Sequence, residues 1–501
     1  MRRAAEHSLA LQGADGSWKV LPDARILETA LGAYALAHTP GDLDREAVAR
    51  ARAWVAAAQP QRHHRVAFLV EDILRRIVLR SGGAIDLTAP EFGEPALSSR
   101  RTLLHALALH AGLEVRAPYG EAELRRRVAD EYERCSQAKL KQWSKAELIA
   151  LHILLQARAG NEAAVEAAKF DLVHVQSPPA GYLFNPVSAS LTYLALCVAA
   201  PTSDPWFVLR ARLLEDQQPD GTWRFCTSDV WDTSLMVRAF REHPYFAQTA
   251  LQPALDFLQA AQNPDGGWPF RLGVESDNDT TGCVLLALRG TMQGERTVDR
   301  ALAYLARVRM DNGLWRTWQF RDDPPVEDVV AHVLSALDAY TGRHRIGTEP
   351  ARQWLAEQIA QRGAWTASWY RGVPYAVAEI SRALGSNHPL AQRGIDALAA
   401  AQREDGGWGA EVGGESTASA TGLALMAIAR RHPARIQRAV QYLVETQRED
   451  GTWPGTPDMY GPRPLLSHFL THTQAFVVGG LMAVRDLDWT APGRSQGEGG
   501  L

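Results

Sequence analysis

The sequence predicts an all-α protein whose C-terminal part is an α/α toroid, and two observations support this prediction. A motif of Gln, a few polar residues, Asp-Gly and a tryptophan recurs along the chain. Strong copies end at Trp18, Trp223, Trp268, Trp408 and Trp453, and weaker copies end at Trp315 and Trp365. From Trp223 onwards these tryptophans are spaced 45, 47, 50, 43 and 45 residues apart. A spacing this regular indicates one supersecondary unit that is repeated.

Each repeat contains two helical patterns of different polarity. The helix before the turn is mixed, as at 438–445 (R-A-V-Q-Y-L-V-E), and the helix after it is almost wholly apolar, as at 420–427 (A-T-G-L-A-L-M-A). Glycine in the D-G-x-W turn supplies the left-handed conformation that ends the first helix. A helix that is apolar all round is buried. A closed toroid buries the inner helices fully, whereas an open stack of helix pairs would leave one side of them exposed to solvent.

The first part of the chain is also helical but less regular, with alanine- and leucine-rich segments such as 102–109 (T-L-L-H-A-L-A-L). We therefore predict two helical domains, residues 1–200 and residues 201–501. The first residues, which include the motif copy ending at Trp18, are expected to pack on the second domain.

Composition excludes several classes of protein. The 501 residues are 46% hydrophobic, enough for large cores, and the formal net charge of −4 gives no basic field for nucleic acid. No apolar run approaches the ~20 residues of a membrane span, and the N-terminus lacks a signal-peptide core. The four cysteines are widely spaced and form no C-x-x-C pair, which favours a reducing cytoplasm. We expect a cytoplasmic protein without stable membrane insertion.

Polar residues directly precede the apolar helices, at 231–233 (W-D-T), 277–281 (D-N-D-T-T), 327–328 (E-D) and 415–417 (E-S-T). Each group alone is typical of a helix N-cap, because Asp, Ser and Thr accept hydrogen bonds from free backbone N–H groups. The segment 277–281 has two carboxylates and two hydroxyls, more than one helix start requires. It is therefore the candidate functional site.

These motifs resemble the class II terpene cyclases, the family of squalene-hopene cyclases and bacterial copalyl- and drimenyl-diphosphate synthases. The tryptophan motif is similar to the family's QW repeat, and D-N-D-T-T falls where the family carries D-x-D-D-T-A or D-x-D-T-T. Residues 230–235 (V-W-D-T-S-L) and 323–334 (D-P-P-V-E-D-V-V-A-H-V-L) match further family segments. The resemblance is nearly continuous over residues 217–485 and faint over the first 200. It implies two α/α-barrel domains of the βγ type, γ-like for residues 1–200 and β-like for residues 201–501. Because the chain opens inside the helix that leads to Trp18, we expect that an N-terminal helix present in relatives is missing here.

The resemblance also implies catalytic roles. Asp279 becomes the general acid that protonates an alkene, Asp277, Asn278 and Asp328 lie beside it, and His332 hydrogen-bonds the donor and increases its acidity. An alkene is a very weak base, so the donor must be a strong acid that stays protonated until used. A helix N-terminus and a cationic histidine favour the carboxylate, while burial and a second acid favour the neutral form.

One departure from the squalene-hopene pattern bears on the substrate. Thr280 stands where those cyclases have a final Asp, and the D-x-D-T-T variant resembles cyclases of prenyl diphosphates. We expect farnesyl diphosphate to be closed to drimenyl diphosphate with the diphosphate retained, and a downstream phosphatase or class I synthase to use the product. Geranylgeranyl diphosphate giving a copalyl- or halimadienyl-type product is the close alternative, and squalene the more distant one.

Aromatic faces hold a carbocation without quenching it. The tryptophans of the D-G-x-W turns are expected to be structural, and the remaining aromatic residues at inner-helix starts are expected to line the substrate cavity, together with two polar neighbours. These substrate-binding candidates are Trp231, Asp232, Phe270, Thr280, Trp318, Trp369, Tyr370, Tyr375 and Phe476. His468 and His472 have metal-ligand spacing but no third ligand, and are expected to be wall or core.

The substrate diphosphate is expected to bind Mg²⁺. The weak candidate ligands, by analogy with two-domain cyclases, are Glu71, Asp72, Glu91 and Glu94, with Arg100 and Arg101 near them in sequence. The pattern D-D-x-x-x-E at 322–327 is similar to the metal motif of ionising class I synthases but lies inside the class II match.

Two other classes of function fit parts of the pattern. A protein prenyltransferase subunit is also an α/α toroid, but it needs a zinc site of Asp, Cys and His, for which only Asp279 and Cys283 lie close together. In a binding scaffold, the acids would all be helix caps.

Overall fold

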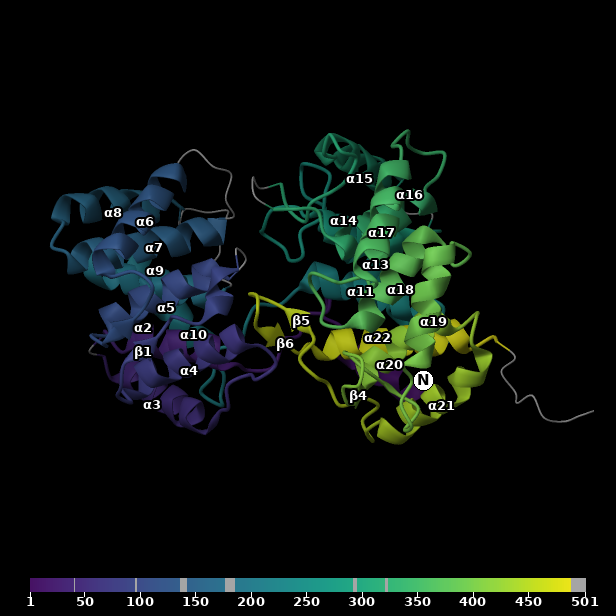
Figure 1. Cartoon of the computed structure of the whole chain (residues 1–501), viewed down its shortest axis with the longest axis horizontal. Helices are drawn as coiled ribbons and strands as arrows, with labels where there is room; N and C mark the ends of the chain where they lie inside the picture. The colour runs from purple at the N-terminus through teal and green to yellow at the C-terminus, as the bar shows by residue number, and fades with distance from the viewer. Residues whose placement is uncertain are drawn as a thin grey trace, which may run out of the picture.

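The computed structural model describes residues 1–39, 41–94, 97–135, 142–175, 185–291, 295–319 and 323–487. Its regular structure is almost wholly helical, and the predicted all-α class with two α/α toroids is confirmed (Figure 1). The helices are α1 (Arg2–Ala10), α2 (Ile26–Leu36), α3 (Asp42–Ala57), α4 (Arg65–Leu79), η1 (Pro90–Gly93), α5 (Ser98–His110), α6 (Glu121–Cys135), α7 (Gln142–Arg158), α8 (Glu162–Val175), α9 (Pro186–Ala199), α10 (Asp204–Asp216), α11 (Asp229–Phe240), α12 (Pro244–Thr249), α13 (Leu251–Ala260), α14 (Asn278–Leu288), α15 (Glu295–Val308), α16 (Glu327–Ala339), α17 (Glu349–Arg362), α18 (Val373–Leu384), α19 (Pro389–Ala400), α20 (Ala418–Ile428), α21 (Pro433–Thr446) and α22 (Leu470–Val484).

Three two-residue ladders accompany the helices. Strand β1 (Ile85–Asp86) pairs in parallel with β2 (Val115–Arg116). Strands β3 (Trp408–Gly409) and β4 (Ser416–Thr417) are antiparallel, as are β5 (Met459–Tyr460) and β6 (Leu466–Ser467). Each ladder tethers a loop and none forms a layer of its own.

Six helices form the closed inner ring of the second toroid: α11, α14, α16, α18, α20 and α22. Each packs against the next, and α22 packs against α11. Helices α13, α15, α17, α19 and α21 lie outside them, and α1 from the start of the chain packs on α22 and α12. Ala4, Ala5 and Trp18 therefore belong to the same hydrophobic core as the inner ring.

The first toroid has a smaller inner ring of α2, α4, α5, α7 and α9, in which α9 packs against α2. Helices α3, α6, α8 and α10 lie outside it. Trp223, which follows α10, packs in this core against Gly32, where an added Cβ would meet the indole ring at 2.7 Å. The division of the chain at residue 200 stays a prediction.

The tryptophan of each motif fixes the turn to the helix before it. In all seven copies the indole Nε1 donates to the backbone oxygen ten residues earlier, at 2.6–2.9 Å. The glutamine fixes the turn to the outer helix of the next repeat: Gln262 Nε2 donates to Gly266 O at 2.9 Å and to Thr297 O, in the first turn of α15, at 2.8 Å. The motif therefore joins consecutive repeats.

The β5–β6 hairpin, in yellow between the two bodies in Figure 1, connects the toroids. Gln61 of the first toroid exchanges two hydrogen bonds with the backbone of Leu466, at 2.8 and 3.0 Å. His63 contacts Pro464 O at 2.8 Å, and Arg100 Nε donates to Arg463 O at 2.9 Å. This contact places the first toroid beside the loops that lead into the inner helices of the second.

None of the helices among the described residues combines the length and the apolar character that crossing a membrane requires.

Candidate active site

Asp277 is the N-cap of α14. Its Oδ1 accepts from the backbone N of Thr280 at 2.6 Å and its Oδ2 accepts from Thr280 Oγ1 at 2.9 Å. Asn278 holds the next loop, because its Nδ2 donates to Arg316 O and its backbone N donates to Thr317 O, both at 2.8 Å. Asp277 and Asn278 therefore stabilise the start of α14 and the loop beside it.

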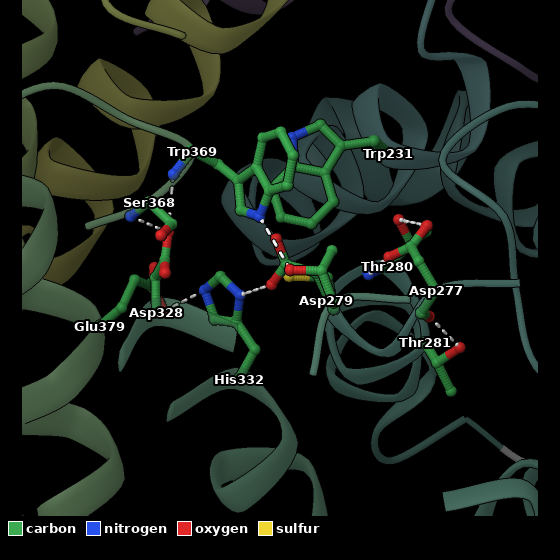
Figure 2. Close-up of polar contacts among 12 residues, drawn as sticks. Trp231, Asp277, Asp279, Thr280, Thr281, Asp328, His332, Ser368, Trp369 and Glu379 are labelled. Carbon is green, nitrogen blue, oxygen red and sulfur yellow. Dashed lines mark hydrogen bonds and ion pairs between the residues drawn. The ribbon is translucent and has the colours of Figure 1, made fainter. Parts of the chain in front are cut away.

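Asp279 is free of that capping role and contacts a histidine one repeat away. Its Oδ1 lies 2.6 Å from His332 Nδ1, so the predicted contact is confirmed (Figure 2). The Asp279 side chain is 8% exposed and the His332 side chain 1%. The close approach depends on Gly282, where a Cβ would lie 3.0 Å from the backbone carbon of His332. Among the described residues, no side chain hydrogen-bonds the second oxygen of Asp279.

The other face of His332 contacts an acid that the sequence analysis did not identify. His332 Nε2 lies 3.3 Å from Glu379 Oε2. Arg238 Nη2 contacts both oxygens of Glu379, at 3.1 and 3.2 Å, and Arg382 Nη1 donates to Glu379 Oε2 at 2.6 Å. A buried chain of charged groups therefore extends from the two arginines through Glu379 and His332 to Asp279.

The electrostatics of this chain favour an imidazolium. Burial alone would raise the pKa of Glu379, but the charges of Arg238 and Arg382 and the contact with His332 hold it well below its ordinary value. Burial opposes charge on His332, but Cys283 and Asp279 beside it raise its pKa well above the ordinary value. A cationic His332 donates from both ring nitrogens, so it can stabilise a carboxylate at Asp279.

Burial raises the pKa values of two other acids near Asp279, which favours their neutral forms. Burial raises the pKa of Asp277 to about 8, against the hydrogen bonds from Thr280. Burial, followed by the charge of Asp279, raises the pKa of Asp328 to about 6. Asp328 Oδ2 accepts from the backbone N of Ser368 at 2.8 Å and of Trp369 at 3.0 Å. Near neutral pH, Asp277 therefore adds little negative charge to the site.

Four of the predicted cavity residues form one aromatic cluster beside His332. The Trp231 ring centroid lies 5.9 Å from that of His332, and Trp231 Nε1 donates to Tyr370 OH at 2.8 Å. Tyr370 stacks on Tyr375 at 4.3 Å, and Phe476 meets both rings edge-on at 5.3 and 5.8 Å. Their electron-rich faces lie where a cation made near Asp279 would be held.

A second aromatic group lies where the toroids meet. Trp318 meets Trp369 edge-on at 5.2 Å, and Trp143 of α7 meets Trp318 at 6.1 Å and Phe270 at 6.4 Å. Trp143 belongs to the first toroid and was not predicted. It follows a polar segment, so its sequence context gave no sign of this contact.

Asp232 and Thr280, both predicted to bind substrate, make their hydrogen bonds to protein. Thr280 bonds to Asp277, as described above. Asp232 is fully buried, and its Oδ1 lies 2.9 Å from His472 Nε2, while His472 Nδ1 lies 3.0 Å from Tyr370 OH. His472, expected to be wall or core, thus connects Asp232 to the aromatic cluster, whereas His468 contacts Asp23 at 2.8 Å.

A signal for Glu379 and Arg238 was present in the sequence. Each is a charged residue within an inner helix that is otherwise largely apolar, α18 and α11 respectively. A charge on a buried helix needs a partner. Because Arg238 and Glu379 carry opposite charges on inner helices, the sequence alone could have suggested that they form an ion pair.

Comparison with known proteins finds similarity over part of the chain. Residues 319–462, which include His332 and Glu379, match the family model of the squalene-hopene cyclase C-terminal domain. The chain is similar to the class II terpene cyclases. A drimenyl diphosphate synthase from Streptantibioticus cattleyicolor is 30% identical over 280 residues, and one from Streptomyces showdoensis is 31% identical over 243 residues. A squalene-hopene cyclase from Bradyrhizobium diazoefficiens is 29% identical over 293 residues.

These alignments cover 50%, 45% and 46% of this chain, and 52%, 45% and 44% of the three relatives. The chain thus spans about half the length of the class II cyclases it matches in sequence. The fold is shared more widely. The structure of ent-copalyl diphosphate synthase from Streptomyces platensis superposes with a TM-score of 0.68 over 97% of this chain and 100% of that one, at 20% identity.

The prediction of a Mg²⁺ ion is wrong. Within the described ranges, no group of three or more His, Cys, Asp or Glu side chains is arranged to hold a metal, and class II cyclases begin by protonation and typically need none. Of the four candidate ligands, Glu71 is buried and accepts from Gln61 N at 2.8 Å, Asp72 and Glu91 are half-buried, and Glu94 is exposed. Asp322 of the class I-like pattern lies outside the described residues.

Proposed function

We propose that this chain is a protonation-initiated cyclase that closes a linear prenyl diphosphate to a bicyclic one and retains the diphosphate. The observation that carries the proposal is the contact of Asp279 Oδ1 with His332 Nδ1 at 2.6 Å, next to the aromatic cluster. One oxygen of the acid is held by a cation, and within the described ranges no side chain hydrogen-bonds the other, which suits a general acid.

The first step follows from this geometry. The Asp279 O–H bond breaks as a C–H bond forms at the terminal alkene of the substrate, and the alkene electrons close the rings. The carboxylate left on Asp279 is stabilised by His332 and by the N-terminus of α14, which favours negative charge. The cation is held by the faces of Trp231, Tyr370 and Phe476, which also exclude water.

The substrate class is supported by two observations. Thr280 replaces the final acid of the squalene-hopene pattern, and the two relatives that are 30% and 31% identical are named drimenyl diphosphate synthases. Farnesyl diphosphate giving drimenyl diphosphate is therefore the favoured reaction. Geranylgeranyl diphosphate is the second candidate, because the chain also shares its fold with ent-copalyl diphosphate synthase.

The anionic end of such a substrate would be met by arginines where the toroids join. Arg463 lies over the Trp369 ring, 5.2 Å from its centroid, and donates to Ser368 O. Arg100 from the first toroid donates to Arg463 O at 2.9 Å. A diphosphate held here would fix the folded chain with its alkene end toward Asp279.

The test is the conversion of farnesyl and geranylgeranyl diphosphate by the wild type and by Asp279→Asn, followed by mass spectrometry of untreated reactions. The wild type is expected to give a cyclic diphosphate. The variant is expected to give none while keeping the unfolding temperature, because an amide cannot donate a strong-acid proton. Asp299→Asn, at a surface residue paired with Arg343, is the matched control. Near-normal turnover by Asp279→Asn, or release of inorganic diphosphate with a free hydrocarbon or alcohol, would contradict the proposal.

A further inference from the structure

A second buried histidine, His472, contacts the aromatic cluster and has no part in the step proposed above. It lies in the first turn of α22, and its side chain is 1% exposed. Its Nε2 lies 2.9 Å from Oδ1 of the fully buried Asp232, and its Nδ1 lies 3.0 Å from the hydroxyl of Tyr370. These three side chains therefore form one continuous series of contacts that ends in the aromatic cluster.

The partners of His472 determine the direction of each hydrogen bond in this series. A carboxylate only accepts, so the neutral imidazole carries its proton on Nε2, toward Asp232, and Nδ1 is an acceptor. The Tyr370 hydroxyl therefore donates to Nδ1, while it accepts from Trp231 Nε1 at 2.8 Å. Burial raises the pKa of Tyr370 well above its ordinary value, so the hydroxyl holds its proton until the reaction. A phenol proton is thus directed at the free lone pair of an imidazole.

The reaction proposed above must end with the removal of a proton, and the following inference rests on that proposed function. A cyclic carbocation becomes an alkene when a C–H bond beside the cationic carbon breaks. Such a C–H bond is very acidic, so the position of the base matters more than its strength. His332 is not suited to this task, because both nitrogens of its imidazolium carry protons and contact acids. We propose that Tyr370 takes this proton and passes its own proton to His472.

The transfer balances within this series of side chains. The C–H bond of the cation breaks, its electrons form the new C=C bond, and the proton goes to the Tyr370 oxygen. At the same time the original O–H proton goes to His472 Nδ1, and Asp232 stabilises the imidazolium that forms. When the product has left, the two transfers run in reverse, and the proton passes to water that enters the emptied site. Tyr370 is thus the catalytic base, His472 its proton acceptor and Asp232 a positioning residue.

A purely structural role accounts for part of this arrangement. Asp232 Oδ1 also accepts from Ser228 Oγ at 2.6 Å, and its Oδ2 accepts from Thr471 Oγ1 at 2.7 Å, so this carboxylate ties α11 to α22. Neither bond requires the second nitrogen of His472 to have a partner. That nitrogen nevertheless contacts the one polar atom of the Tyr370 side chain, whose ring belongs to the cluster proposed to hold the cation. This placement is what a proton acceptor requires.

The experiment measures which products form as well as how fast the substrate is consumed. The substrate is farnesyl or geranylgeranyl diphosphate, whichever the wild type converts, and the products are identified by gas chromatography and mass spectrometry after phosphatase treatment. Tyr370→Phe keeps an aromatic face but has no oxygen to take the proton. The cation then loses a different proton or is captured by water. We expect the share of alkene isomers and hydroxylated products to rise at least about tenfold over the wild type.

Three further variants show whether the effect belongs to the relay. His472→Gln keeps a donor for Asp232 but cannot take a proton, so it is expected to give the same by-products, and it provides the decision if Tyr370→Phe does not fold. Tyr375→Phe removes the hydroxyl of the ring stacked on Tyr370 at 4.3 Å. Whatever its rate, its products are expected to be those of the wild type. Tyr442→Phe, on the outer helix α21, is the control for rate and product.

Every other outcome overturns the inference or the function separately. If either Tyr370→Phe or His472→Gln folds and gives only the wild-type product, the proton is removed elsewhere. If Tyr375→Phe gives the same by-products, the change reflects a disturbed aromatic cluster and not a lost relay. If the folded variants consume no substrate, these residues act before the cation forms, and the assignment is wrong. If the wild type forms no cyclic diphosphate, the proposed function fails and not the base alone.

Discussion

Replacing His332 by Gln tests the electrostatic basis of the proposed acid. Glutamine can still hydrogen-bond Asp279 but carries no charge, so the carboxylate formed by proton transfer loses its ion pair. At an effective dielectric constant of about 20, two unit charges about 4 Å apart attract each other by about 4 kcal/mol. Only part of that charge has developed in the transition state, and each 1.36 kcal/mol corresponds to about tenfold in rate. We therefore expect kcat to fall by about 10²- to 10³-fold.

The assay is the initial rate of cyclic diphosphate formation at saturating substrate, with the unfolding temperature measured in parallel. His432→Gln is the control, because it also removes a histidine that contacts an aspartate, but at the surface, where such pairs contribute little. A His332→Gln enzyme with kcat within about threefold of the wild type would refute the reasoning, because the charge of His332 would then be irrelevant to proton transfer.

Two more predictions concern Asp277 and the repeat turn. Because burial raises the pKa of Asp277 to about 8, the folded state holds this proton more tightly than the unfolded chain. The stability that the bound proton contributes is present below about pH 4 and is lost as pH rises to about 8. The unfolding temperature of Asp277→Asn should therefore depend less on pH over that range than that of the wild type. Above pH 8 a second carboxylate makes Asp279 a weaker acid and wild-type kcat falls, and this fall should be smaller in Asp277→Asn. In the repeat turn, Gly406→Ala should destabilise more than Gly413→Ala, by urea unfolding. Both glycines have positive φ, +89° and +81°, but only at Gly406 would the Cβ meet a backbone oxygen, Arg438 O at 2.4 Å; equal losses would show that the contact is relieved by a small shift.

The toroid could be predicted because the tryptophan motif recurs at a regular spacing in the sequence. Trp268 and Trp408 each end a D-G-G-W turn, and each donates a hydrogen bond to the backbone oxygen ten residues earlier. Local chemistry of this kind needs no knowledge of the rest of the chain. The contact of Asp279 with His332 was predicted from the family resemblance, supported by the position of both residues near the starts of inner helices one repeat apart.

The part of the site that escaped prediction depends on closure of the ring. Glu379 reaches His332 only because α18 follows α16 around the toroid, and Arg238 reaches Glu379 across the lumen from α11. The sequence shows that such buried charges need partners but not which helices face one another. Trp143 is harder still, since its contact with Trp318 requires the first toroid to be placed against the second.

The division of labour between neighbouring acids explains why two carboxylates stand at the start of α14. A helix N-terminus stabilises negative charge, and an acid that caps it directly is held as a hydrogen-bond acceptor by backbone N–H groups. Asp277 takes this position and satisfies Thr280 N at 2.6 Å. Asp279, two residues further along, therefore keeps an oxygen free of backbone donors while remaining close to the positive end of the helix. In the proposed reaction, both the helix end and His332 would stabilise the carboxylate that proton transfer leaves on Asp279. A single acid at this helix start would have to serve as cap and donor at once, and its proton would compete with the backbone for the same oxygen.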